Sequence, residues 1–140
     1  MADDGEAYGK FLPEGIPAWQ QPFWDSLRAH RVEVQRCDGC GAFRYVPKEI
    51  CNRCHRPEAT WTPLAGTGEV YTYTVVRRAP TPAYQAEAPY ALVHVSMDEG
   101  FRMIGSMRVD DAGTVAIGRR VRVAYDDVTA DWTILRFEPA

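Results

Sequence analysis

The four cysteines are the residues of this sequence whose type and spacing best suit a defined chemistry. They form two C-x-x-C pairs, Cys37 with Cys40 and Cys51 with Cys54, and ten residues separate the pairs. Each pair can direct two thiolates at one metal ion from a single tight turn. Four thiolates at about 2.3 Å make a closed tetrahedral zinc site with no open position for a substrate. The spacing therefore predicts one structural zinc ion.

Two disulfides, a redox pair or an iron centre are the alternatives for the same cysteines. A cytosolic setting disfavours disulfides, and a redox C-x-x-C motif belongs to a βαβ pattern that this sequence lacks. Iron accepts the same ligands, but ligand type and geometry favour zinc. Zinc would also supply stability that the segment lacks, because about thirty residues bury too little apolar surface to fold alone. Binding contributes about 10–16 kcal/mol in zinc-finger peptides.

No other residues form a recognisable catalytic group. The sequence contains no G-x-S-x-G elbow, P-loop, G-x-G-x-x-G or H-E-x-x-H motif. We interpret the three histidines, His30, His55 and His94, as structural residues at a helix end, beside a cysteine turn and within a strand. The acidic pairs at 110–111 and 126–127 fall at strand ends, where aspartate is ordinary turn chemistry. If all four thiols bind metal, none remains as a nucleophile, so we expect no catalytic residue in this chain.

The elements that must position the cysteines follow from the apolar pattern, which predicts a mainly β protein. Trp19, Phe23, Trp24 and Leu27 recur at helical spacing and predict one amphipathic helix. Beyond the cysteines, alternating Val, Tyr and Thr predict five short strands, and five such strands suit an OB-fold barrel, with a partly open sandwich as the alternative. The expected division is a flexible lead at 1–15, the helix at 16–32, a zinc ribbon at 33–63 and the OB-fold at 64–140. The expected barrel strands span 68–78, 90–98, 101–110, 120–129 and 132–138, with a connector at 112–118 that has room for a helical turn.

Composition and charge narrow the class of protein. The chain has 140 residues, a hydrophobic share of 46% and a net charge of −3. Because phosphate neutralisation supplies most non-specific affinity for nucleic acid, the lack of a basic excess makes a nucleic-acid partner unlikely. No apolar run is long enough to cross a membrane. The acidic start lacks the pattern of a secretory signal, so we expect a cytoplasmic protein.

Two features of the expected barrel suggest a ligand. Arg77 and Arg78 follow its first strand, and arginine forks bind phosphate oxygens well. A nucleotide-bearing ligand or a nucleic acid would satisfy them, although a solvated outer face is the simpler explanation. The long loop at 79–89 contains several prolines and Tyr84, and loops of this length often carry function. We therefore consider Tyr84 a candidate contact residue.

Several short motifs follow one another along the chain: Pro22-Phe23-Trp24, Arg36 to Gly41, Tyr45-Val46-Pro47, Cys51 to Cys54, Gly66 to Val75, Pro89-Tyr90, Asp98-Glu99-Gly100 and Ile117 to Val121. In this order, nearly the whole sequence after the first fifteen residues resembles the rubredoxin-like zinc-ribbon proteins that carry a C-terminal OB-fold and are associated with acyl-CoA metabolism. One departure is Asn52, which stands where proline is usual; proline is not a ligand, so the metal site is unaffected.

This resemblance implies a non-catalytic auxiliary subunit of a thiolase-superfamily enzyme that acts on a CoA thioester. Members of the family accompany thiolases or thiolase-type aldolases, and those of this size resemble subunits from the breakdown of aromatic compounds or of steroid side chains. The partner would then supply the missing nucleophile, and the chain itself could also contact the CoA thioester, through Arg77 and Arg78 at its phosphates.

The resemblance also gives the aromatic residues a role. Trp19, Phe23, Trp24 and Tyr84 become candidates for contacting the partner enzyme, since aromatic clusters commonly anchor interfaces. Packing of the helix stripe onto the protein's own barrel is an equal alternative. Two other functions stay open: a nucleic-acid-binding OB-fold module with a structural zinc ribbon, and a free-standing acyl-CoA-binding protein.

Overall fold

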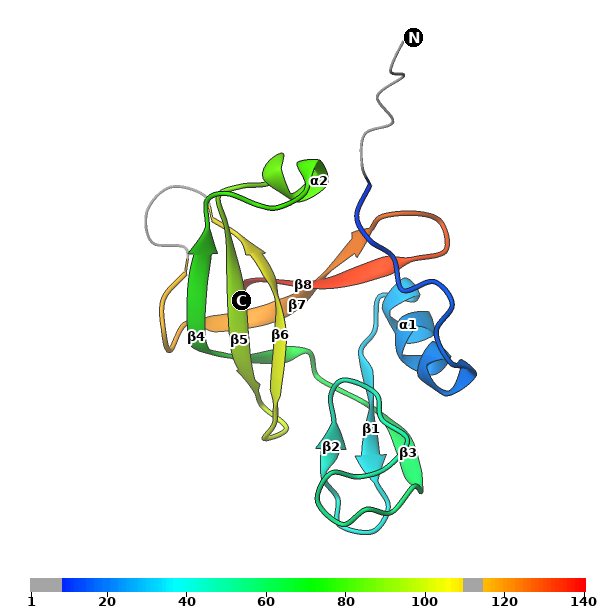
Figure 1. Cartoon of the computed structure of the whole chain (residues 1–140). Coiled ribbons are helices and arrows are strands. Elements are labelled where there is room, and N and C mark those ends of the chain that lie inside the picture. The colour runs from blue at the N-terminus through cyan, green and yellow to red at the C-terminus, as the bar shows by residue number, and fades with distance from the viewer. Residues whose placement is uncertain (1–8, 110–114) are drawn as a thin grey trace, which may run out of the picture.

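The computed structural model describes residues 9–109 and 115–140, and these form a helix, a small ribbon sheet and a barrel in chain order (Figure 1). Residues 1–8 of the predicted lead and part of the connector at 112–118 lie outside the described residues; Ile117 and Gly118 form a turn. No helix among the residues described is long and apolar enough to span a membrane. The elements are η1 (Ala18–Gln20), α1 (Gln21–Arg28), β1 (Glu33–Cys37), β2 (Phe43–Arg44), β3 (Ala59–Pro63), β4 (Thr67–Val76), α2 (Pro82–Gln85), β5 (Tyr90–Met97), β6 (Arg102–Arg108), β7 (Arg120–Asp127) and β8 (Thr133–Pro139).

Strands β4 to β8 close into a barrel in the order β4-β5-β6-β8-β7. All neighbours are antiparallel except β6 and β8, which pair in parallel at Ser106 with Arg136 and at Met107 with Phe137. Strand β4 pairs with β5 along most of its length and with β7 near its start, and the pairing with β7 closes the barrel. The predicted mainly β fold with a five-stranded OB-type barrel is confirmed.

The barrel core follows from alternation along the strands. On β5, Ala91, Val93 and Val95 are fully buried and point inward, while Leu92 between them is exposed. On β6, Met103 and Met107 fill the same interior. Because side chains alternate between the two faces of a strand, β5 buries Ala91, Val93 and Val95 more deeply than the residues between them.

The ribbon is a three-stranded antiparallel sheet in the order β2-β1-β3. The composition of β3 gives only a weak strand signal, so this strand was not predicted. It pairs with the whole of β1, from Glu33 opposite Pro63 to Cys37 opposite Ala59. Ala59, Trp61 and Pro63 alternate with Thr60 and Thr62 along β3, but Trp61 is its only large apolar residue.

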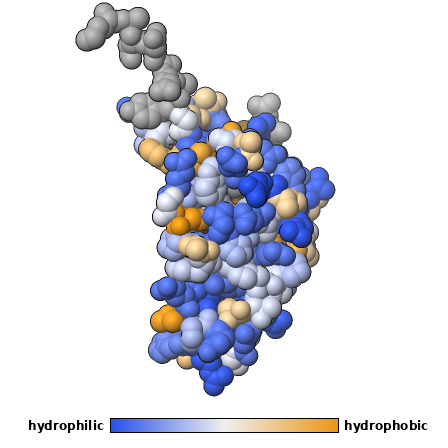
Figure 2. All heavy atoms as spheres, turned by 90° about the vertical axis from the view of Figure 1, so that its right-hand side faces the viewer, coloured by the Kyte–Doolittle hydropathy of each residue, from blue (hydrophilic) through white to orange (hydrophobic). Residues whose placement is uncertain are grey.

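Helix α1 packs against the chain's own core, between the ribbon and the barrel. Phe23 is only 4% exposed and meets Trp24 and Tyr45 edge to face, with ring centroids 5.2 Å and 6.1 Å away. Trp24 in turn meets Trp132 of the turn before β8 at 6.0 Å. The Ser26 hydroxyl donates to the Phe23 carbonyl and accepts from the Glu33 amide, which joins the helix to β1. Figure 2 shows this side of the molecule as mostly hydrophilic, with isolated apolar residues.

A short connection joins the ribbon to the barrel. The amide of Leu64 donates to the Val32 carbonyl at 2.9 Å, and the amide of Ala65 donates to the Glu99 carboxylate at 3.0 Å. Gly66 follows with a φ of 78°, which suits glycine, and its carbonyl accepts from the Val123 amide. Every residue between β3 and β4 is therefore hydrogen-bonded to a neighbouring element.

Candidate metal centre

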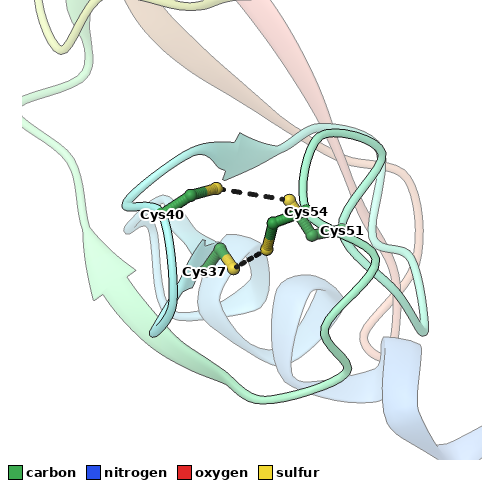
Figure 3. Close-up of side chains that lie close together, drawn as sticks. All are labelled: Cys37, Cys40, Cys51 and Cys54. Atoms are coloured by element: carbon green, nitrogen blue, oxygen red, sulfur yellow. Dashed lines mark hydrogen bonds between the residues drawn. The ribbon is translucent and has the colours of Figure 1, made fainter.

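The four cysteine side chains converge on one point at the end of the ribbon. Their Sγ atoms all lie within 4.8 Å of one another. The Sγ atoms of Cys37 and Cys54 are 3.4 Å apart, and those of Cys40 and Cys51 are 3.6 Å apart (Figure 3). A tetrahedron of thiolates at about 2.3 Å from zinc has edges of about 3.8 Å, whereas a disulfide needs about 2.05 Å. The four cysteines thus fit one four-coordinate zinc ion.

Two similar turns place these sulfur atoms. In the first, the Gly41 amide donates to the Cys37 carbonyl at 2.9 Å, and in the second the His55 amide donates to the Cys51 carbonyl at 2.9 Å. Gly41 and His55 both have a positive φ, 75° and 62°. Each turn needs a residue in the left-handed region one position after its second cysteine, a conformation that glycine adopts without strain. His55 therefore terminates a turn, in agreement with its structural interpretation.

Backbone amides favour the thiolate form in each pair. The pKa of Cys37 is lowered to about 6, chiefly by the Cys40 amide, and the pKa of Cys51 is lowered by the amides of Cys54 and Arg53. At Cys54 the Arg56 amide lowers the pKa, but hydrogen bonding to Cys37 and burial outweigh it and raise the pKa to about 11. Since the thiolate is the form that binds zinc, each turn presents one sulfur already biased towards the ligand state.

Arg44 supports the second turn from inside the ribbon, and the sequence analysis missed it. Its side chain is 1% exposed, the largest fully buried one in the described chain. Its guanidinium also contributes to lowering the pKa of the Cys37 thiol. Because zinc with four thiolates carries a net charge of −2, a buried guanidinium offsets part of that charge. Its nitrogens donate to five carbonyls, those of Lys48, Glu49, Arg56, Pro57 and Glu58, at 2.7 to 3.4 Å.

The predicted partner-contact residues fall into two places. Phe23, Trp24 and Tyr84 border one cleft of about 350 Å³ between α1, α2 and the barrel. Trp19 lies apart from them, at a hollow beside the second cysteine turn. Since Phe23 is in the core, the structure agrees with the alternative in which this residue packs onto the chain's own barrel. As partner contacts, these four residues stay a prediction.

The predicted phosphate-contact residues, Arg77 and Arg78, are exposed just after β4 and lie outside the metal centre. A separate ion cluster, which no local motif indicates, joins the start of the described chain to the barrel. Lys10 contacts the carboxylates of Glu87 and Asp126, and Arg136 lies 3.5 Å from Glu87. Burial lowers the pKa of Lys10, but hydrogen bonds to these carboxylates outweigh it and raise the pKa. The described part of the lead is thereby fastened to the barrel.

Comparison with known proteins agrees with this two-part architecture. A model of the rubredoxin-like zinc ribbon domain of ChsH2 matches residues 24–58, and a model of the C-terminal OB-fold domain of ChsH2 matches residues 61–126. The chain is also 34% identical over 97 residues to a DUF35 domain-containing scaffold protein of Methanocaldococcus jannaschii, covering 69% of this chain and 68% of that protein. The chain belongs to the DUF35 family. The family resemblance and the zinc-ribbon assignment are thus confirmed.

One further relative and one solved structure that resemble this DUF35 chain carry the names of enzymes or enzyme subunits. It is 31% identical over 117 residues to a 3-oxo-4,17-pregnadiene-20-carboxyl-CoA hydratase alpha subunit of Mycobacterium tuberculosis, covering 84% of this chain but 36% of that protein. The DUF35 chain therefore spans little more than a third of the hydratase subunits that it matches. A solved structure described as an Ltp2-ChsH2(DUF35) aldolase superposes with a TM-score of 0.77 at 27% identity, covering 89% of this chain and 97% of that one.

Proposed function

We propose that this DUF35 chain is a non-catalytic auxiliary subunit that binds a thiolase-like enzyme acting on a CoA thioester, plausibly in steroid side-chain or aromatic-compound degradation. The observation that carries the proposal is the superposition on 97% of the DUF35 chain of an aldolase that has two named components. The ribbon and the barrel together account for that chain. The thiolase-like class of the partner comes from the family resemblance of the motifs.

The absence of a spare nucleophile supports the auxiliary role. All four thiols of the chain lie in the metal cluster, so each is engaged when zinc is bound. Two relatives are named hydratase alpha subunits, but this chain matches only 37% and 36% of them. The hydratase activity in those names can therefore reside in the part that has no counterpart here.

The steroid assignment and the CoA contact are finer parts of the proposal. The Mycobacterium tuberculosis relative is named for a pregnadiene carboxyl-CoA, which is a steroid thioester. Arg77 and Arg78 are exposed near α2, which carries Tyr84. Guanidinium groups there suit the phosphates of CoA, and Tyr84 lines the adjoining cleft.

Co-expression with a candidate thiolase-like enzyme from the same cell tests the function. We expect a stable complex on size-exclusion chromatography and a partner whose turnover of its CoA thioester changes when this chain is removed. Calorimetry of the isolated chain with acyl-CoA separates this role from a free-standing acyl-CoA carrier. A chain that stays monomeric beside every thiolase-like enzyme, or turns over a thioester unaided, contradicts the proposal.

A further inference from the structure

The outer surface of β5 and β6 is unusually apolar for a strand face that meets solvent. Leu92 is 40% exposed and Ile104 is 45% exposed, although their neighbours along each strand already fill the barrel core. The register pairs Leu92 with Ser106 and His94 with Ile104, so Leu92 and Ile104 are diagonal neighbours. Outward positions of a half-solvated sheet are normally polar. These two aliphatic side chains therefore need another explanation.

Strand β4 extends this apolar surface. Tyr71 occupies the irregular position where the β4–β5 register shifts, and it remains about half exposed. Its ring meets His94 edge to face at 6.1 Å, and the Arg102 guanidinium lies over it at 3.6 Å. We call the surface made by Tyr71, Leu92, His94, Arg102 and Ile104 the open face.

The open face continues into the cleft beside α1. Leu92 and Ile104 line the rim of that cleft of about 350 Å³, which runs inward to Phe23, Trp24 and Tyr45. The Trp24 Nε1 hydrogen is buried and meets no acceptor among the described residues. An exposed apolar surface beside a cleft lined by aromatic rings suits a protein partner that inserts a side chain.

The charges around the open face indicate the character of its partner. Strands β5 and β6 contain no aspartate or glutamate, while Arg102 and Arg108 lie on β6. Arg108 makes no ion pair with any residue that the structure describes. An apolar centre with a basic rim complements an apolar surface bordered by carboxylates. Single-stranded nucleic acid fits less well, because bases stack on aromatic rings and the centre of this face is aliphatic.

We infer that the open face is the docking surface for the thiolase-like enzyme subunit, which covers Leu92 and Ile104 with apolar side chains and meets Arg102 and Arg108 with carboxylates. The inference rests on the proposed function and adds the location and chemistry of the contact. It also centres binding on the barrel, with the cleft beside α1 at its edge, since Phe23 of the α1 stripe is already in the core.

Charge substitution at the centre of the open face tests the inference. Ile104→Glu should weaken binding to the co-expressed thiolase-like enzyme about tenfold or more, because a carboxylate would be buried against apolar and acidic surface. Ile117→Glu is the matched control, since Ile117 is the same side chain, is 69% exposed and lies in the turn before β7. Its affinity should equal that of the wild type. Zinc content and circular dichroism report whether each variant is folded.

Arg102→Glu provides a second variant that leaves the apolar centre in place. It should weaken the complex and reduce the sensitivity of binding to salt, as expected for a lost charge contact at a rim. A wild-type complex that both Ile104→Glu and Arg102→Glu leave unchanged overturns the open-face inference while the proposed function stands. A wild-type chain that binds no thiolase-like enzyme overturns both. Salt-sensitive binding of a single-stranded oligonucleotide that Arg102→Glu abolishes assigns the face to nucleic acid and also overturns the inference.

Discussion

The ribbon and the barrel hold themselves together by different means. The barrel buries aliphatic residues, methionines and one phenylalanine in a continuous core. The ribbon has few such residues beyond Val32 and Val34, and its other buried side chains include Cys37, Cys51, Gln35 and Arg44. One module therefore depends on apolar area removed from water, and the other on a metal ion and a buried cation.

This difference teaches which changes each module tolerates. An aliphatic core distributes its stability over many contacts, so one lost side chain weakens it by a few kcal/mol. A metal-centred module concentrates its stability in four bonds, so one lost ligand removes most of it. Substitutions in the ribbon should therefore change mainly the zinc content, and substitutions in the barrel should change mainly the stability of the barrel.

The largest expected effect is that of Cys37→Ala. With one thiolate missing, zinc content should fall from one ion per chain to none, and the ribbon amides should lose their protection from hydrogen exchange. The barrel amides should keep theirs, because the barrel core does not include the metal site. Asn52→Ala, an exposed residue between the ligands of the second turn, should retain one zinc ion. Loss of barrel protection in Cys37→Ala would break the distinction between the two modules.

Next in size is a substitution in the barrel core. Phe137 is 2% exposed, and Phe137→Ala should lower the free energy of unfolding by about 3–5 kcal/mol through the cavity that it leaves. Zinc content should stay at one ion per chain. Phe11→Ala, at a residue 76% exposed, should change the free energy of unfolding by no more than about 0.5 kcal/mol. Denaturant unfolding followed by circular dichroism measures both, and zinc loss from Phe137→Ala would contradict the prediction.

A smaller effect is expected at Arg44, which sharpens the role of the buried cation. Arg44→Met keeps the apolar stem but leaves five carbonyls without their donor, so zinc affinity should fall about 10- to 100-fold. Competition with a chelator measures this affinity. Arg44→Lys should recover part of it, because a single ammonium restores charge but not the fork of donors. Arg53→Met, at an exposed arginine of the second turn, is the control and should bind zinc like the wild type.

The smallest expected effect is a pH dependence of stability, which comes from the ion pair between Asp98 after β5 and Arg120 of β7. Asp98 accepts hydrogen bonds from both Arg120 nitrogens at 2.7 Å and from Thr67, and these hold its pKa well below the usual value. An aspartate with a depressed pKa stabilises the fold above its unfolded pKa of about 3.9, and the contribution is lost as the pH falls further. The melting temperature of Asp98→Asn should lie below that of the wild type at pH 7, and the difference should shrink below about pH 4. A difference that is independent of pH would refute this role.

Much of the architecture was predictable because its signals are local. The paired C-x-x-C spacing was enough to identify the metal ligands, because each pair is formed within a single turn of the chain. The alternation of Val, Tyr and Thr sufficed for the five barrel strands, whose observed bounds differ from the expected ones by up to two residues. The apolar stripe of α1 was also visible, but the observed helical segment, Ala18 to Arg28, is shorter than the expected 16–32.

The remaining features depend on partners distant in sequence. Arg44 gives no local sign of burial, because the carbonyls that it binds belong to a later loop. Strand β3 is short and has Trp61 as its only large apolar residue, so its pairing with β1 decides its conformation. For Phe23, periodicity identified the apolar face of the helix but not which surface covers it. Likewise, the position of Leu92 and Ile104 on the outer face follows from the strand register and not from their apolar type.

The short connection at Leu64, Ala65 and Gly66 has a mechanical consequence. Because each of its residues is hydrogen-bonded to a flanking element, the joint has little freedom to swing. A partner that binds the barrel therefore also fixes the orientation of the metal-binding end of the ribbon. Inserting two glycines into this connection would leave the ribbon and the barrel folded, but their relative orientation would no longer be fixed.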